Sequence, residues 1–569
     1  MLDFMIIASD DRTWPQLSHI ATDGESYGHH HHYGEMALSY ALHRIETGDQ
    51  AKLTNYGQFL EMHPPEVRAE IVENTSWSCV HGVERWKSNC GCNSGGHPEW
   101  NQEWRAPLRQ ALDWLRDTLA PRFEQEAKGL LKDPWAARNS YIDVMLDRSD
   151  ESLNRFFAQH AAHELDQPAK VRALKLLEMQ RNAMLMYTSC GWFFDELSGI
   201  ETVQVIQYAG RAIQMACELT PDESLGSQFC EKLRNAKSNL AEHGDGERIY
   251  KKWVLPAQVT MDHVTGHYAV SSLFENYADR TKIYCYGVDR MEYGLETEGR
   301  VRLALGRVHV QSDITREEIS LSFGVLHLGD HNITGGVRES PDENVFHGLR
   351  DNLNSAFGRA DMPEVIRILD EQFDKSRFSL SSLFRDEQRR IVKLILKDTL
   401  NSVGASFRNV YENQAALMRF LAGLGIPVPP ALSSAATIAL NSQLQQALER
   451  QEIDVASVQS LVREAEMNRI HLDETTIEYA MRKRLEEQAA ELVKKPGDLE
   501  TLKRLHSMLD IAAALPRPVI LWEVQNLCFG PLSKTNGNGA NPGENGTRQE
   551  WYREAAAVRE QLHIHGASA

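Results

Sequence analysis

The residue types best suited to acid–base chemistry lie close to the start of the chain. Asp23 and Glu25 stand two residues apart, and His29 and His30 follow them in the stretch TDGESYGHH. A carboxyl group with a raised pKa can protonate a leaving group, and a second carboxylate nearby raises the cost of ionising it. Asp-Gly is also a common turn dipeptide, so a purely structural turn is the alternative interpretation.

A second group of reactive side chains follows further along the chain. Cys79, His81, Cys90 and Cys92 form the pattern C-x-H-x8-C-x-C, and these are ligand types that a tetrahedral zinc ion accepts. The C-x-C spacing differs from the usual C-x2-C knuckle, so buried free thiols or a cysteine pair at a tight turn are favoured over a metal. The four histidines 29–32 are not expected to bind one ion, because successive side chains cannot easily all face it.

Acidic residues dominate the charge. The chain of 569 residues carries 80 Asp and Glu against 61 Lys and Arg, a formal net charge of −19. A phosphate-binding surface needs clustered basic residues, so nucleic acid and anionic membranes are not expected as partners, whereas a neutral, hydroxyl-rich substrate is compatible. The eight cysteines are too few for a disulfide scaffold. The opening residues do not resemble a secretory signal and no apolar run reaches ~18–20 residues, so we expect a cytoplasmic protein.

The elements that would position the acidic residues form an α/β unit. Residues 16–21 are predicted as a short strand, Asp23 and Glu25 follow in a loop, and the apolar stripe of residues 35–44 predicts a helix. Carboxylates at the end of a strand occupy the position that catalytic residues have in βα-barrels.

Three further regions differ in their periodicity. Residues 105–260 are predicted as helices, residues 264–340 as an antiparallel sheet or sandwich, and helices return from about 360 to 525. The clearest predicted helices are 171–187, 201–219, 385–400, 477–492 and 549–562, and the clearest strands are 282–288, 301–310 and 319–328. A Gly- and Asn-rich stretch at 534–546 predicts a flexible loop or linker.

Both reactive segments resemble signatures of one enzyme family. The stretch Thr22–His30 resembles the fourth signature of glycoside hydrolase family 57, and the stretch Asn74–Trp86 resembles the fifth, in which a Ser-Trp pair precedes a second Trp. The resemblance implies that Asp23 is the general acid/base of a retaining enzyme and that Trp77 stacks on a sugar ring. The implied substrate-binding residues are Glu25, His29, His30, Trp77 and His81.

The rest of the chain resembles an uncharacterised group of family 57-like proteins whose C-terminal region is a domain of unknown function, number 3536. The strings TSCGWFFDELSGIET, from Thr188, and LFRDEQRRIVKLIL, from Leu383, carry this likeness. Family 57 enzymes act on α-glucans as amylases, branching enzymes or glucanotransferases, with a distorted (β/α)7 barrel and a helical domain behind it. The resemblance implies an α-glucan or oligosaccharide partner and a chemistry without metal or cofactor.

The resemblance is incomplete at one point. In the family the nucleophilic Glu lies upstream of the acid/base, but the 22 residues before Asp23 contain no Glu, only Asp3, Asp10 and Asp11. We therefore expect a fragment of a longer enzyme or a chain completed by a separate N-terminal half. The alternative function is that of a non-catalytic glucan-binding or structural protein.

The predicted fold class is α/β plus α plus β, a partial (β/α)7-type barrel followed by a helical bundle, a β-sandwich-like region and a C-terminal helical region. Half a barrel would leave strand edges unpaired, which is a further reason to expect a completing segment. The predicted domains are the barrel remnant at 1–104, the helical domain at 105–262, the β-rich domain at 263–345, the C-terminal helical domain at 346–528, the loop at 529–548, and the terminal helix and tail at 549–569.

Overall fold

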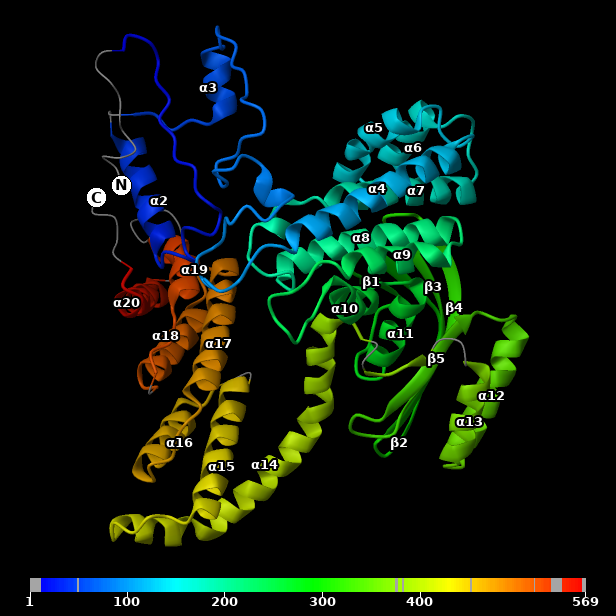
Figure 1. The fold of residues 1–569 in the computed structure, drawn as a ribbon. Helices are drawn as coiled ribbons and strands as arrows, with labels where there is room; N and C mark the ends of the chain where they lie inside the picture. Colours follow the sequence, from blue (N-terminus) through cyan, green and yellow to red (C-terminus); the bar gives the residue numbers. More distant parts are fainter. Residues whose placement is uncertain are drawn as a thin grey trace. The chain divides into compact units, whose positions relative to one another are not determined.

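The computed structural model describes residues 12–48, 51–373, 377–380, 383–450, 453–515, 517–533 and 545–564. The helices and strands are labelled in Figure 1. The chain forms two compact units. Unit 1 comprises residues 1–129 and 175–258, and unit 2 comprises residues 130–174 and 259–569. Each unit is therefore built from two segments that are separate in the sequence.

Unit 1 is helical in its described residues, and α4 (Arg105–Ala127) lies in its core. This helix contacts α8 (Ile200–Leu219) and α9 (Glu223–Leu233). Leu108 and Leu112 begin a fully buried stripe that continues at helical spacing along α4. Burial of one such side chain contributes about 1.5–3 kcal/mol. The other elements are α2 (Gly34–Thr47), α3 (Tyr56–Met62), η1 (Glu84–Trp86), the second part of α7 (Gln167–Leu185), η2 (Ser189–Trp192), α10 (Gly246–Ile249), η3 (Tyr250–Val254) and η4 (Leu255–Ala257).

Unit 2 contains an antiparallel sheet of six strands, in which neighbours along the chain are neighbours in the sheet. The strands are β1 (Arg280–Ile283), β2 (Tyr286–Glu298), β3 (Val301–Ser312), β4 (Glu318–His327), β5 (Ile333–Glu339) and the short β6 (Arg377–Phe378). The first and last strands do not pair with each other, so the sheet is open and does not close into a barrel.

Helices cover both faces of this sheet (Figure 1). On one face Ala304 of β3 packs in a cluster with α11 (Met261–Ser272). On the other face Leu305 packs in a cluster with α12 (Glu343–Gly358) and α13 (Met362–Gln372). Strand β3 is therefore apolar on both sides, which explains why part of its sequence is a continuous apolar run.

The C-terminal helices form another core of unit 2. Their buried side chains include Leu440, Leu485 and Trp551. Helix α14 contributes to both cores, because Ile391 is buried among the sheet residues and Met418 among the C-terminal helices. The helices are α14 (Arg385–Gly423), α15 (Pro430–Glu449), α16 (Val455–Met467), α17 (Glu474–Lys494), α18 (Leu499–Ala513), α19 (Trp522–Ser533) and α20 (Asn545–Gln561), and the N-terminal segment of unit 2 adds α5 (Pro134–Leu146) and α6 (Asp150–His160).

The helices predicted from periodicity are confirmed. Four of the predicted helices, at 171–187, 201–219, 477–492 and 549–562, correspond to α7, α8, α17 and α20 over most of their length. The fifth, α14, begins at Arg385 as predicted but continues to Gly423. The predicted strands at 301–310 and 319–328 correspond to β3 and β4. The chain is thus mostly helical around one antiparallel sheet.

Three parts of the predicted fold are wrong. The described residues 12–48 and 51–104 hold helices, turns and a single bridge between Tyr27 and His31 but no strand, so neither the strand at 16–21 nor a partial (β/α)7 barrel is present there. A lone strand leaves its backbone groups unpaired and is not stable. The run at 282–288 is a hairpin of β1 and β2, because Tyr284 between them has a left-handed φ of 54°. In place of a sandwich, helices cover both faces of one sheet.

Other predictions lie beyond what the described residues can show. Most of the loop predicted at 529–548 lies outside them, and its first residues belong to α19. Among the described helices, none combines the length and the apolarity that crossing a lipid bilayer requires. The domain boundaries and the cytoplasmic location stay predictions.

Gly210 on α8 provides a test of the packing in unit 1. A Cβ added there would lie 2.4 Å from Cγ1 of Val254, closer than two carbon atoms can approach. We predict that Gly210→Ala lowers the free energy of unfolding by about 1–3 kcal/mol, the usual cost of overpacking a core.

The matched control is Gly226→Ala on α9, where the nearest atom is Cγ2 of Ile213 at 3.9 Å. There the added methyl group should raise the free energy of unfolding by about 0.5–1 kcal/mol, because alanine favours the helix over glycine. Chemical denaturation measures both effects. Equal shifts of the same sign would contradict the close approach at Gly210.

Candidate functional site

The predicted acid/base residue lies in an exposed turn of unit 1. Asp23 and Glu25 are both exposed, and the backbone N–H of Ser26 donates to the carbonyl of Asp23 at 3.0 Å. Glu25 pairs with His30, with 3.2 Å between Oε1 and Nε2, and the rings of His29 and His30 are in edge contact at 4.9 Å. The structure therefore brings four of the predicted site residues into one surface turn, which we call the acidic turn.

Backbone hydrogen bonds fold the acidic turn back on itself before α2 begins. The N–H of His30 donates to the carbonyl of Glu25 at 3.2 Å, and the N–H of His31 donates to the carbonyl of Ser26 at 3.1 Å. Gly28 has a φ of +112°, a conformation that glycine adopts without strain. Gly28, which lies in the stretch that resembles a family 57 signature, thus makes the turn.

Trp77 and Trp86, the two tryptophans of the stretch Asn74–Trp86, have different surroundings. Trp77 is 88% exposed, so its indole is open to a stacking partner. The Nε1 of Trp86 instead donates to the carbonyl of Ser189 at 3.0 Å, which ties that ring to the segment before α8. Of the two, Trp77 is the one available to a ligand.

Cys79, His81, Cys90 and Cys92 converge on one point of unit 1. Their four potential ligand atoms all lie within 4.8 Å of one another. The Sγ of Cys79 lies 3.9 Å from that of Cys90 and 3.8 Å from that of Cys92, and the Sγ of Cys92 lies 3.5 Å from Nδ1 of His81. We call this group the thiol–imidazole cluster. It places His81, a predicted sugar-binding residue, beside three thiols.

Two glycines turn the chain so that the cluster can form. Gly82 has a φ of +79°, and its N–H donates to the carbonyl of Cys79 at 3.1 Å. A Cβ at Gly82 would lie 2.2 Å from the carbonyl oxygen of Asn74, so no other residue fits. Gly91 also has a φ of +79°, which turns the backbone between Cys90 and Cys92.

A buried arginine connects the cluster to the helical core. Arg105, the first residue of α4, is fully buried. Its Nη1 donates to the carbonyl of Cys92 at 3.0 Å and lies 4.0 Å from the Sγ of Cys90, and its Nη2 donates to the carbonyl of Phe194 at 3.3 Å. Arg85 is also buried and donates to the carbonyl of Phe193 at 3.2 Å. Arg105 therefore places a positive charge beside the Cys90 thiol.

A buried carboxylate holds the far end of the same loop. Both oxygens of Asp195 accept from the N–H of Ser94, at 3.0 and 2.9 Å, and its Oδ2 also accepts from the Ser94 hydroxyl. The Nε1 of Trp104 donates to the carbonyl of Asp195 at 3.2 Å. Sequence reasoning missed Asp195 and Arg105 as partners of the loop. The available signal was an acidic pair placed directly after the apolar run Trp-Phe-Phe.

The cluster lowers the pKa of its buried thiol. Burial raises the pKa of Cys79, but the backbone N–H groups of Arg85 and His81 and the thiols of Cys92 and Cys90 outweigh it, and the pKa falls to about 7. A substantial fraction of this thiol is therefore ionised near neutral pH. The thiolate is the form that attacks electrophiles and binds metals.

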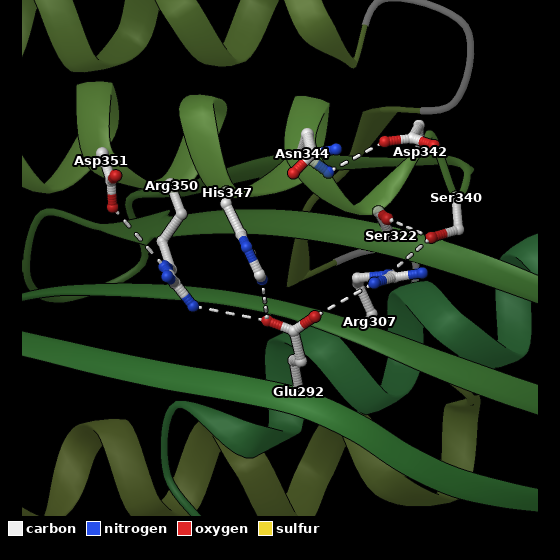
Figure 2. A network of polar contacts seen from close by, with 9 residues as sticks. All are labelled: Glu292, Arg307, Ser322, Ser340, Asp342, Asn344, His347, Arg350 and Asp351. Atoms are coloured by element: carbon white, nitrogen blue, oxygen red, sulfur yellow. Dashed lines mark hydrogen bonds and ion pairs between the residues drawn. The ribbon is translucent and has the colours of Figure 1, made fainter.

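A second set of potential ligand atoms, from Glu292, Glu343 and His347, lies in unit 2. Figure 2 shows that Glu292 already has three partners: the guanidinium groups of Arg307 at 3.0 Å and Arg350 at 3.3 Å, and the imidazole of His347 at 3.1 Å. It follows a bulge in β2 and stands opposite Arg307 of β3. A carboxylate enclosed by arginines has no charge left to attract a cation, so this network joins β2 and β3 to α12 and is not a metal site.

Comparison with known proteins identifies one family. Residues 100–384 match the family described as "Domain of unknown function (DUF3536)", which is half of the chain. The chain belongs to this family. The DUF3536 match contains the string that begins at Thr188, so this part of the resemblance is confirmed. It begins after the acidic turn and Trp77, so the likeness to glycoside hydrolase family 57 stays a prediction. No curated protein and no solved structure matches the chain.

Glu292 should be important for the stability of unit 2. We predict that Glu292→Gln lowers the free energy of unfolding by about 1.5–3 kcal/mol, the usual value of a hydrogen bond to a charged group, because it leaves Arg307 and Arg350 facing a neutral amide. Chemical denaturation measures this change.

The matched control is Glu371→Gln, which removes an ion pair with Arg367 in which both side chains are more than half exposed. That change should be clearly smaller, since water screens exposed pairs. A Glu292→Gln variant as stable as the control would show that the network in Figure 2 does not stabilise the sheet.

Proposed function

We propose that the chain is the acid/base-bearing part of a carbohydrate-active enzyme of the glycoside hydrolase family 57 type, which hydrolyses or transfers α-glucan with retention. The observation that carries the proposal is the acidic turn, in which Asp23 stands exposed while Glu25 is paired with His30. The resemblance of the stretch Thr22–His30 to the family 57 signature is the second support for the proposal.

In the proposed reaction the two carboxylates of the turn have different roles. The Asp23 carboxyl protonates the glycosidic oxygen as the bond breaks, and its carboxylate then accepts a proton from water or from an acceptor sugar. Glu25 shares a hydrogen bond with His30, so it orients the turn and does not transfer the proton. His29, in edge contact with His30, lines the same surface.

The proposal requires a nucleophile roughly 5–5.5 Å from Asp23, as in other retaining enzymes. We assign this role to none of the carboxylates of the chain. The nucleophile is expected on a companion segment, either joined to the chain or assembled with it. Closure of a sugar cleft over Asp23 would then depend on that segment.

A second candidate function is glucan binding without turnover. The observation that favours it is the exposure of Trp77, because an open indole ring suits the apolar face of a sugar. In this alternative the acidic turn supplies hydrogen-bond acceptors for hydroxyl groups and no proton. The two candidates differ in whether Asp23 is required for a reaction.

Asp23→Asn tests the enzymatic candidate. The amide keeps the shape of the side chain but cannot donate the proton, so turnover of maltooligosaccharides and glycogen should be lost while the thermal unfolding temperature is unchanged. The assay uses the chain and the longest reading frame that contains it. Asp117→Asn, at an exposed aspartate of α4, is the matched control and should keep full activity.

Two outcomes would decide against this role of Asp23. Undiminished turnover in Asp23→Asn would remove it from the mechanism. No turnover by the unmodified protein in either form, with glucan binding retained, would favour the binding candidate.

Trp77→Ala tests the stacking contact that both candidates use. We predict that affinity for maltooligosaccharides, measured by calorimetry, falls by about 1–3 kcal/mol, the usual range for a buried aromatic contact. The matched control is Trp14→Ala, at another exposed tryptophan of unit 1, which should leave the affinity unchanged. If Trp77→Ala and Trp14→Ala bind maltooligosaccharides with equal affinity, Trp77 has a structural role and does not contact the sugar.

A further inference from the structure

We propose that Cys79, His81, Cys90 and Cys92 bind one Zn²⁺ ion in a closed tetrahedral site, which fixes the loop between Trp77 and Trp104. The site is structural, because four protein ligands leave no position for water or substrate. The proposal is independent of the proposed carbohydrate chemistry, and it adds to the chain a metal that this chemistry does not use.

Three of the six distances between ligand atoms in the thiol–imidazole cluster agree with the edges of a zinc tetrahedron, and all six lie within 4.8 Å. With Zn–S bonds near 2.3 Å and Zn–N bonds near 2.0–2.1 Å, the edges should be about 3.8 Å between two sulfurs and about 3.5 Å between sulfur and nitrogen. The structure gives 3.9 and 3.8 Å for the two sulfur pairs of Cys79, and 3.5 Å between Cys92 and His81. Because Cys79 is equally close to both partners, the geometry does not single out a disulfide pair.

The charge around the cluster suits the same assignment. Three thiolates and one Zn²⁺ carry a net charge of −1, since the imidazole is neutral. Arg105 is fully buried, with Nη1 4.0 Å from the Sγ of Cys90, and its charge would balance that of the site. Its Nε has no hydrogen-bond partner among the described residues. With neutral thiols, the buried carboxylate that acts on this guanidinium would be Asp195, and the thiolates of a zinc site would add to that compensation.

The loop itself explains why a metal is needed. Between Ser76 and Gly95 the regular structure is one short turn of helix, η1, and the buried residues are Cys79 and Arg85. A segment with so little apolar burial cannot offset the entropy of ordering its backbone. Metal ligation can supply that free energy, as it does in other small folds without a sufficient core.

The groups around the ligands orient them as the neighbours of a metal site usually do. Arg105 donates to the carbonyl of Cys92, and the N–H of Gly82 donates to the carbonyl of Cys79. His81 faces the thiols through Nδ1, so it would bind through this atom. Such hydrogen bonds hold ligands in place and adjust the charge on sulfur.

Metal analysis of the purified full chain is the first test. We expect one Zn²⁺ per chain by mass spectrometry after reducing purification, and a Co²⁺-substituted protein with the absorption of tetrahedral thiolate coordination. The thiols of Cys79, Cys90 and Cys92 should resist alkylation until a chelator removes the metal. Cys190, which is exposed and outside the cluster, should react at once in both states.

Substitutions supply the second test. Cys90→Ser and Cys92→Ser should each abolish stoichiometric zinc and lower the thermal unfolding temperature, whereas the matched control Cys190→Ser should keep both. If the first two variants do not fold, the alkylation pattern of the unmodified chain still decides. The proposal fails if the chain, refolded under reducing conditions with added Zn²⁺, retains none, if another metal is bound in place of zinc, or if peptide mapping finds a Cys79–Cys90 or Cys79–Cys92 disulfide.

Discussion

The buried guanidinium of Arg105 is the constraint on which the arrangement of unit 1 depends. A charge taken out of water must be surrounded by acceptors, because an unpartnered one would destabilise the fold by several kcal/mol. Arg105 obtains its acceptors from two places, the carbonyl of Cys92 in the cysteine loop and the carbonyl of Phe194 after η2. One side chain thereby holds three segments together: the cysteine loop, the start of α4 and the segment before α8.

The fold was predictable from sequence where burial alone determines the element. Helices α7, α8 and α17 were predicted because an apolar stripe at helical spacing needs only a core to pack on. The strand expected at 16–21 failed for the opposite reason: a strand needs a partner strand, and partial alternation within one segment carries no information about a neighbour. The hairpin at Tyr284 was missed because a left-handed residue other than Gly or Asn leaves little trace in the sequence.

The candidate site was only partly predictable. The cysteines and His81 were recognisable as ligand types, but their convergence was not, because the expected knuckle uses a different spacing. Here the left-handed backbone of Gly91 turns the chain between Cys90 and Cys92, and Gly82 returns it toward Cys79. Asp195, which holds Ser94, lies 101 residues away from it in sequence. Contacts of this separation are set by the packing of helices and not by local pattern. The acidic turn, by contrast, could be recognised in the sequence because all of its residues lie in one short stretch.

Helix α14 has a consequence for how unit 2 can deform. It is an unbroken helix of 39 residues, and it places Ile391 in the core of the sheet and Met418 in the core of the C-terminal helices. Between Ile391 and the buried Gly404 the described side chains, Leu400 and Val403 among them, are exposed or half-buried, so these turns are held mainly by backbone hydrogen bonds. If one core reorients relative to the other, α14 must bend or some of its turns must break. Mechanical strain in unit 2 will therefore concentrate in this helix.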